Sequence, residues 1–463
     1  MKTLLIRCND KLNINTREVD SVVRNMGIWP PLGLLYLASY LKANNQDVEI
    51  LDLLLLKLNK EELKEKIKSI NPDLVGITIT TPEIQEALEI ASIAKDLKKI
   101  IVVGGTHLSI FPKETLFFDF VDYGIIGDGE IPLLKLIEHI QDNKYPLNEI
   151  EGLIYKDKEI FMNGISIIKN LDALPFPDWS LVNIKDYSRA DALFPMVTMA
   201  SARGCPYQCG FCFRSEEQKV VRIRSAKNIV DEIENLINKH KIKEIIFSND
   251  IITINREQMI NICNEILRRN IKVAWQGATR VNLVDKELLK LMKKAGCKQL
   301  KYGVESGDQR ILEIMKKQTK LSQVIEAFKL TKEAGMKTGA YFIIGYVGED
   351  EQTMRQTIEF AKELNPDYVM FYPGVPLPKT SFHELSVQDG LIDKNYWREY
   401  SLNLRKDKLP YVVKDVERFI NIAFREFYSR PNYIIKKAFD IQSWKALAKN
   451  PKLLKGILWT KIK

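Results

Sequence analysis

Residues 196–214 read MVTMASARGCPYQCGFCFR, and this stretch decides how the second half of the chain is interpreted. Its first five residues, MVTMA, are almost all apolar and predict a short buried strand. Three cysteines follow in the pattern C-x-x-x-C-x-x-C, at Cys205, Cys209 and Cys212. Because loops at the carboxyl ends of parallel strands carry the active sites of β/α barrels, this position indicates a chemical role for the cysteines.

Three thiolates on one loop are suited to an iron–sulfur cluster. They can ligate three irons of a cubane and leave the fourth iron open to another ligand, unlike an electron carrier with four cysteines. The alternatives are a zinc site and three unrelated thiols, but zinc usually takes a fourth Cys or His at regular spacing, and none follows nearby. We therefore predict a [4Fe–4S] cluster, and no role for Cys8, Cys263 and Cys297.

A repeating series of strands and helices continues from the cysteine loop. Between residues 195 and 390, apolar runs such as EIIFSN, KVAWQG, QLKYGV, KTGAYFIIG and DYVMFY alternate with amphipathic stretches. The count is six strands, which is too few for a closed eight-unit barrel and predicts a partial barrel with one open side. Residues 391–463 are mostly helical in pattern.

The first 145 residues form another series of the same kind. The runs KTLLIR, DVEILD, DLVGIT, KIIVVGG and YGIIG alternate with amphipathic stretches. Continuously apolar strands favour a doubly wound parallel sheet, whose ligands bind beyond the carboxyl ends of its strands. Residues 146–194 indicate a hairpin followed by an extended connector. The fold class is therefore α/β, with a Rossmann-like domain at 1–145, a linker at 146–194, a partial barrel at 195–390 and a helical C-terminal region.

Composition limits the class of protein and its location. The chain is 45% hydrophobic and 28% charged, as globular proteins are, and the net charge of +9 is weak evidence for nucleic acid binding. It has no run of eighteen uncharged apolar residues, and its cysteines suit a reducing compartment, so we expect a cytoplasmic protein. Trp444 and Trp459, with lysines around them, leave open either peripheral membrane contact or a tail docked on the barrel.

The cysteine loop and five later segments resemble the radical S-adenosylmethionine (SAM) superfamily. The cluster motif is matched by the three cysteines, with Phe211 before the last of them. FSNDIITIN, WQGATRV, YGVESGDQRIL, FIIGYVGED and YPGVPLPKTSF resemble, in order, segments at the strand ends of that family's barrel. Val347 is a departure, because the family's G-x-P-G-E segment has proline there. The resemblance covers residues 195 to about 385.

This resemblance implies that the open iron binds SAM, which one electron cleaves to a 5'-deoxyadenosyl radical. An external one-electron reductant, such as flavodoxin or ferredoxin, is implied as a partner. The resemblance also implies SAM contacts from six residues that can pair with polar groups or let a nucleotide approach closely. They are Phe211, Asp250, Arg280, Glu305, Ser306 and Gly345.

The N-terminal series resembles the cobalamin-binding domains that precede such barrels. The segments WPPLGLLYLASYLKANNQDVEILD, NPDLVGIT, GGTH and GDGE occur in that order. The implied cobalamin-binding residues are Thr78, Thr80, Gly104, Gly105, Thr106, His107, Gly127, Gly129 and Glu130. The motif D-x-H-x-x-G, whose histidine would coordinate cobalt, is absent, so we expect cobalamin to bind without a histidine ligand. His107 is equally well explained as a loop histidine bonded to the backbone.

Together the resemblances imply a cobalamin-dependent radical SAM enzyme. The expected reaction is methyl transfer from SAM through cobalamin to an unactivated carbon or phosphorus centre of a small-molecule, lipid or peptide substrate. A cyclase or rearrangement enzyme stays open, because FREFYSRPNYIIKKAF resembles the tails of anaerobic cyclase-like and hopanoid-modifying members. A more distant alternative is a non-enzymatic iron–sulfur sensor. The sequence does not identify the substrate or the oligomeric state.

Overall fold

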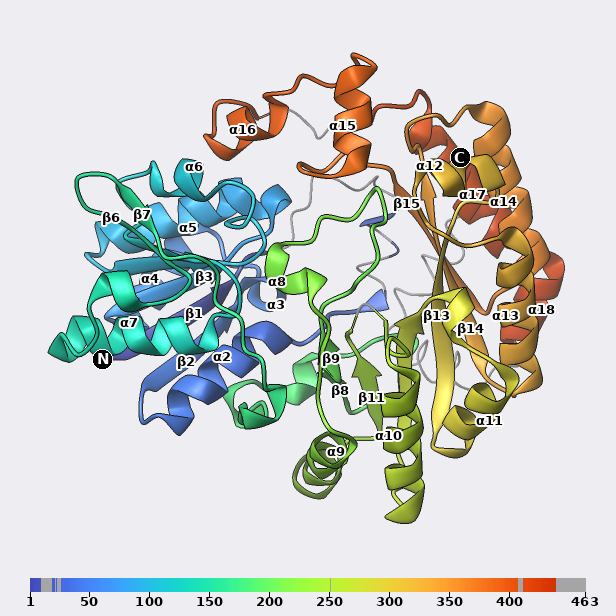
Figure 1. Ribbon diagram of the computed structural model, residues 1–463, viewed down its shortest axis with the longest axis horizontal. Coiled ribbons are helices and arrows are strands. Elements are labelled where there is room, and N and C mark those ends of the chain that lie inside the picture. Colours follow the sequence, from blue (N-terminus) through green and yellow to red (C-terminus); the bar gives the residue numbers. More distant parts are fainter. Residues whose placement is uncertain (10–18, 21, 23–25, 250, 407–410, 439–463) are drawn as a thin grey trace.

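The computed structural model describes residues 1–9, 19, 20, 22, 26–249, 251–406 and 411–438. They form two α/β units side by side, the N-terminal unit in blue to cyan and an open barrel in green to orange (Figure 1). Among the helices described, none is long and apolar enough to cross a membrane.

The N-terminal unit is a seven-stranded sheet in the order β2-β1-β3-β4-β5-β6-β7. Its first five strands in this order are parallel to one another. Strand β6 then runs antiparallel to β5, and β7 runs antiparallel to β6. The strands are β1 (Lys2–Arg7), β2 (Asp47–Asp52), β3 (Leu74–Thr78), β4 (Ile100–Gly104), β5 (Tyr123–Ile125), β6 (Leu153–Lys156) and β7 (Ile160–Met162). The predicted doubly wound parallel sheet is confirmed, with the order reversing between β1 and β3.

Helices cover both faces of this sheet. The apolar core on one face is completed by α2 (Leu32–Ala43) and α7 (Glu130–Asp142). The core on the other face is completed by α4 (Lys60–Ile70) and α5 (Ile84–Asp96), which the short α3 (Leu53–Leu56) and α6 (Pro112–Leu116) accompany. Because the central strands β1, β3 and β4 are buried on both faces, their sequences are mostly apolar rather than alternating, whereas the edge strands β2 and β7 include exposed residues.

The hairpin predicted within residues 146–194 is present but is not part of a linker. Strand β6 pairs antiparallel with β5, and β7 pairs with β6, so the hairpin forms the edge of the N-terminal sheet. The physical reason is that β5 would otherwise leave a row of backbone N–H and C=O groups without partners. The N-terminal unit therefore extends to Met162.

The second unit is a sheet of six parallel strands in the order β15-β14-β13-β12-β11-β8. They are β8 (Met196–Met199), β11 (Glu244–Phe247), β12 (Ala274–Thr279), β13 (Cys297–Glu305), β14 (Lys337–Ile344) and β15 (Tyr368–Pro373). Since β8 and β15 are both edges, the barrel is open between them, as predicted. Its outer helices are α9 (Ala226–His240), α10 (Arg256–Arg268), α11 (Lys286–Lys294), α13 (Leu321–Glu333) and α14 (Glu351–Leu364), and the shorter α12 (Gln309–Ile314) follows β13.

The cysteine loop leaves the barrel through a small antiparallel ladder. Strand β9 (Ala202–Arg203) pairs with β10 (Arg222–Ile223), and the loop between them carries the short helix α8 (Glu216–Lys219). In Figure 1 this green segment lies between the two units. The ladder fixes both ends of the loop at the junction of the domains.

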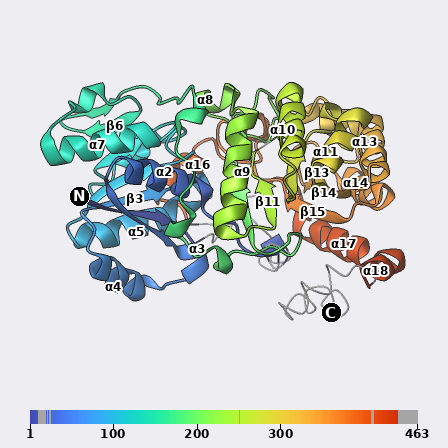
Figure 2. The same cartoon turned by 90° about the horizontal axis from the view of Figure 1, so that it is seen from below.

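The C-terminal helices contact both units. They are α15 (Ser381–Gln388), α16 (Tyr396–Ser401), α17 (Val416–Tyr428) and α18 (Pro431–Ala438). Helix α16 packs against α5 and α6 and buries Trp397 and Tyr400 in the N-terminal core, whereas α17 packs against β15 and α14. Figure 2 shows α17 and α18 on the side of the barrel away from the N-terminal unit. Trp444 and Trp459 lie outside the described residues.

Candidate functional site

A cavity of about 560 Å³ opens at the carboxyl ends of β1, β3, β4 and β5. This is where a doubly wound sheet binds its ligands, and the volume is in the range of cofactor sites. Of the nine residues predicted to bind cobalamin, seven line the cavity: Thr78, Thr80, Gly104, Gly105, Gly127, Gly129 and Glu130.

Glycines keep this cavity open. A Cβ atom built on Gly33 would meet no atom within 4 Å, and one built on Gly104 would meet only a carbonyl oxygen at 3.9 Å. Both residues line the cavity, so a side chain at either position would project into open space that a ligand can use. Glycine is needed at position 105 for a different reason: its φ of +104° and the nearby backbone of Ile79 exclude a side chain.

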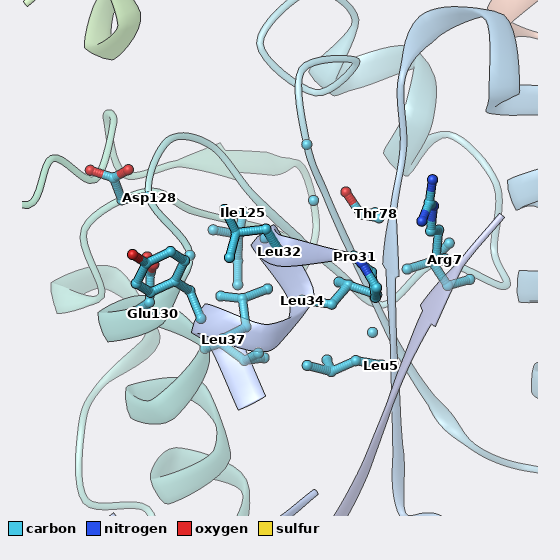
Figure 3. A pocket seen from close by; sticks show the side chains of 18 of the residues that line it. Leu5, Arg7, Pro31, Leu32, Leu34, Leu37, Thr78, Ile125, Asp128 and Glu130 are labelled. Atoms are coloured by element: carbon cyan, nitrogen blue, oxygen red, sulfur yellow. The ribbon is translucent and has the colours of Figure 1, made fainter. Parts of the chain in front are cut away.

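The cavity has an apolar middle and polar ends. In Figure 3, Leu34 and Ile125 lie between Asp128 and Glu130 on one side and Arg7 and Thr78 on the other. A large flat molecule with polar substituents, such as cobalamin, fits this distribution. The described lining residues include no histidine, cysteine or methionine, so this wall offers cobalt no ligand of these kinds.

His107 and Thr106 are not on the cavity wall. The His107 side chain is buried in the core, where its Nδ1 lies 3.1 Å from the Thr81 hydroxyl and its Nε2 has no partner among the described residues. Burial lowers the pKa of His107 to about 3, which keeps the ring neutral. The position of this imidazole is that of a core residue rather than a residue facing a ligand.

Two carboxylates on the cavity rim bind arginines of the barrel unit. Arg203 donates to Asp128 at 2.7 Å and to Glu130 at 2.5 Å, and Arg222 forms a second ion pair with Asp128. Arg203 is also part of the cavity wall and stands two residues before Cys205. The predicted cobalamin residue Glu130 is thus committed to an ion pair between the two units.

The cysteine loop is held by backbone hydrogen bonds from three directions. The Cys205 N–H donates to Gln218 O at 2.8 Å, the Gly210 N–H donates to Met315 O at 2.7 Å, and the Phe382 N–H donates to Gly210 O at 2.8 Å. Cys205 and Cys209 are half-buried and Cys212 is exposed. The loop therefore has a fixed path while its thiols stay accessible.

The six cysteines divide into two groups. Cys8, Cys263 and Cys297 are at most 1% exposed, and burial raises the pKa of Cys263 to about 12 and those of the other two thiols well above their usual range. Such thiols resist the deprotonation that metal binding requires. Within the described part of the chain, no three His, Cys, Asp or Glu side chains converge on a metal-sized point, the loop cysteines included. The three cysteines of the loop are nevertheless soft donors, accessible and of the right number to hold a cluster with three protein ligands.

Two cations lie beside the cysteine loop. The Arg280 Nη1 is 3.3 Å from the Cys209 sulfur, and its guanidinium stacks on the ring of Tyr207 at 3.9 Å. The Lys317 Nζ is 2.6 Å from Glu305 Oε1 and 5.7 Å from the centre of the Phe211 ring. Arg280 also donates to the Lys317 carbonyl, which joins the two groups. Three predicted SAM residues, Phe211, Arg280 and Glu305, are therefore gathered around the loop.

The other predicted SAM residues lie differently. Ser306 is fully buried, and its hydroxyl contacts Thr357 of α14 at 3.2 Å. Gly345 has a φ of +94° and donates to Glu349 Oε2 at 2.7 Å, so it shapes the turn after β14. Burial raises the pKa of Glu349 to about 7. Asp250 lies outside the described residues.

Sequence reasoning missed Lys317, Tyr207 and Arg203. Lys317 belongs to the run KKQTK, which is typical of a solvated turn, yet the side chain is only 5% exposed. The partners of Arg203 lie 73 and 75 residues earlier in the chain, so no local sequence pattern predicts this pairing. The one usable signal was the position of Tyr207 between two of the cysteines.

Comparisons with known proteins agree with this arrangement. The model of the radical SAM superfamily matches residues 199–361, and that of the B12 binding domain matches residues 22–137. An uncharacterized methyltransferase of Pyrococcus horikoshii is 33% identical over 418 residues, which cover 89% of this chain and 90% of that protein. The anaerobic magnesium-protoporphyrin IX monomethyl ester cyclase of Rubrivivax gelatinosus is 31% identical over 420 residues, 87% of this chain and 76% of that protein.

A solved structure has the same fold. The radical SAM methyltransferase TsrM from Kitasatospora setae, with cobalamin and a [4Fe–4S] cluster bound, aligns with a TM-score of 0.67 at 20% identity. The alignment covers 85% of this chain and 76% of that one. The succession of a doubly wound sheet and an open barrel is therefore shared with that protein.

Proposed function

Because the chain belongs to the radical SAM superfamily and carries a B12-binding domain, we propose that it transfers a methyl group from SAM, through cobalamin, to an unactivated carbon or phosphorus centre. Its cofactors are a [4Fe–4S] cluster, SAM and cobalamin. Radical SAM enzymes act on small-molecule substrates and commonly need an external reductant. A flavodoxin or ferredoxin as that reductant, and a cytoplasmic location, are part of the proposal.

One observation carries the proposal: the cavity and the cysteine loop share a wall. Ala200, Arg203 and Ser248 of the barrel unit line the cavity of the N-terminal unit. Arg203 lies in β9, the strand that leads directly into the cysteine loop. Two cofactors bound at these places would therefore border the same space, as a reaction that uses both requires.

Each side of this space has its own residues. Cys205, Cys209 and Cys212 would hold the cluster, which supplies the electron for cleavage of SAM, while cobalamin carries the methyl group. Arg280 positions Cys209 through its N–H···S contact and places a positive charge beside the thiolate. The buried pair of Lys317 and Glu305 offers charged groups next to the loop.

The cavity side would position cobalamin mainly through shape. Gly33 and Gly104 leave room for a flat ring, and Leu5, Leu34 and Ile125 provide an apolar wall. The ion pairs of Arg203 with Asp128 and Glu130 hold the rim of the cavity against the ladder that carries the cysteine loop. The relative position of the two cofactors then depends on these pairs.

A second candidate is cyclisation or rearrangement with the same cofactors. It is favoured by the similarity to two anaerobic magnesium-protoporphyrin IX monomethyl ester cyclases, at 31% and 30% identity over 87% and 93% of this chain. The two reactions differ in their products, because only methyl transfer turns SAM into S-adenosylhomocysteine.

Product analysis separates these candidates. The protein is reconstituted anaerobically with iron, sulfide and cobalamin, supplied with SAM and dithionite, and assayed for 5'-deoxyadenosine and S-adenosylhomocysteine. Methyl transfer predicts both products, and deoxyadenosine without S-adenosylhomocysteine would favour the second candidate. If neither product exceeds the amount formed by Cys209→Ala, the enzyme assignment is wrong. Cys297→Ala is the matched control, because Cys297 is buried away from the loop.

A further inference from the structure

A second pocket, of about 110 Å³, lies at the open side of the barrel. Residues of β14 and β15, including Tyr341 and Tyr372, line one side of it. Trp29, Arg189 and Asp191 close it from two segments that cross the gap, which are joined by the Ala190 N–H donating to Met26 O at 2.9 Å. Its size suits the head group of a molecule rather than a whole substrate.

The charges of this pocket do not balance. The Asp191 carboxylate is buried and accepts from Arg189 Nε at 3.0 Å and from Lys301 Nζ at 2.6 Å. A further carboxylate that acts on Lys301, that of Glu244, is paired with Lys298 at 2.6 Å. Among the residues that the structure describes, the buried Lys301 and the largely buried Arg189 share this one carboxylate, which leaves one excess positive charge around it in a region of low dielectric constant. A buried charge of this kind is costly unless an anion accompanies it.

An amide without partners stands beside these cations. Both polar atoms of the Gln299 side chain are buried, and among the described residues neither has a hydrogen-bond partner. A Cβ built on Gly339, which lines the pocket, would lie 2.8 Å from Lys301 Cγ and 3.5 Å from Gln299 Nε2. The amide and the lysine stem are therefore neighbours over the same glycine. An oxyanion at this place could accept from both side chains.

Aromatic rings surround the charged groups. The Arg189 guanidinium stacks on Trp29 at 4.1 Å, and the Lys301 Nζ lies 5.7 Å from the same ring. Tyr341 and Tyr372 complete the aromatic wall. A ligand here would meet positive charge at one point and flat apolar surface around it.

We propose that this pocket binds an anionic head group, a carboxylate or a phosphate carried on an apolar or aromatic body, and that it anchors the methyl acceptor. Lys301, Arg189 and Gln299 recognise the anion, and Asp191 holds both cations in place. Lys301 lies on β13, the strand that ends at Glu305 beside the cysteine loop, so the anchored molecule would occupy the barrel below the cofactors. The assignment of the anion to the methyl acceptor rests on the proposed function, whereas the binding of an anion in this pocket does not.

The test uses small probes and the reconstituted holoenzyme without reductant. Benzoate and phenyl phosphate are the anionic probes, benzylamine is the cationic probe and benzyl alcohol is the neutral one, and binding is followed by calorimetry and ligand-observed NMR. We expect an anionic probe to bind with a Kd in the millimolar range or tighter, and at least tenfold more tightly than the cationic and neutral probes. The ratio of benzoate to phenyl phosphate affinity separates a carboxylate from a phosphate site.

Two variants with opposite expected effects guard against misfolding. Lys301→Met should weaken binding of the anionic probe roughly tenfold. Asp191→Asn removes the competing negative charge but keeps one side-chain oxygen that can accept from the cations, so it should tighten binding of the probe severalfold. Lys185→Met, at an exposed position, should leave the affinity of both anionic probes unchanged. Absence of anion binding at millimolar concentration, equal binding of benzylamine, or weakening by both variants would overturn the proposal. Formation of S-adenosylhomocysteine would be unaffected by such a failure, so the proposed function is tested separately.

Discussion

The two cofactor regions of the molecule are built in opposite ways. The cavity at the strand ends of the N-terminal sheet is shaped by glycines and packed apolar walls. The cysteine loop has a fixed backbone path, but its thiols are not gathered at one point. One site is therefore defined by the shape of the fold, whereas the other depends on three thiols of one loop and the cluster that they would hold.

The largest expected effect comes from breaking the site that depends on metal. Cys209→Ala removes one of three cluster ligands, so we expect SAM cleavage to fall by roughly a thousandfold or more. Absorbance and electron paramagnetic resonance should show loss of the [4Fe–4S] signal, while cobalamin uptake is retained. Cys297→Ala should keep the cluster. A Cys209→Ala protein that binds a full cluster and cleaves SAM would contradict the assigned ligands.

Filling the cavity of the N-terminal sheet should weaken cobalamin binding and leave the cluster intact. Gly104→Val adds a side chain where only one atom lies within 4 Å, so the chain should fold while cobalamin affinity falls roughly a hundredfold. Equilibrium dialysis measures the affinity, and the cluster absorbance checks that the barrel is intact. Thr106→Val, in the same loop but away from the cavity wall, is the control. Unchanged affinity in Gly104→Val would remove cobalamin from this cavity.

The contact between the two regions gives a smaller effect. Arg203→Met removes the cation that pairs with the buried Glu130 carboxylate and one of the two cations that pair with Asp128. We expect the free energy of unfolding to fall by about 2 kcal/mol, less than for a fully buried pair, because the guanidinium is 22% exposed. Denaturant unfolding gives this value, and Arg203→Met combined with Glu130→Gln should recover part of it. Unchanged stability would show that the ion pairs do not join the units.

The smallest expected effect concerns His107. Its pKa is lowered to about 3 in the folded chain, below the unfolded value of about 6.5, so the unfolded chain binds more protons as the pH falls. Stability contributed by the neutral ring is therefore present above pH 6.5 and is lost below it. Between pH 7.5 and 5.5, the wild-type chain should lose roughly 1 kcal/mol more than His107→Leu. Equal pH dependence, or a changed spectrum of bound cobalamin in the variant, would contradict a buried role away from the ligand.

Most of the fold follows from hydrophobic pattern alone. The six barrel strands and the first five strands of the N-terminal sheet are short apolar runs between amphipathic helices, and each was found at its predicted place. The pairing of β6 with β5 was not predictable in this way, because a hairpin carries no signal for which sheet edge it joins. The packing of α16 on the N-terminal unit is another such long-range contact.

The site residues also fall into those that a local motif predicts and those that depend on long-range contacts. The cysteine loop and the glycines Gly104, Gly105, Gly127 and Gly129 could be predicted because their motifs are local. Glu130 was found on the rim, yet its pairing with Arg203 depends on how two distant units meet. The burial of Lys317 and the cation excess around Asp191 are likewise products of tertiary packing, which composition and spacing do not encode.

The central claim, that cobalamin in the N-terminal cavity takes part in methyl transfer, is tested most directly by measuring S-adenosylhomocysteine against cobalamin content. Anaerobic preparations with an intact cluster are loaded with increasing amounts of cobalamin and supplied with SAM and reductant. We predict that S-adenosylhomocysteine rises in proportion to bound cobalamin and is absent in Gly104→Val, which keeps its cluster. Formation of the same amount at every cobalamin loading, or in the variant that binds none, would contradict the account.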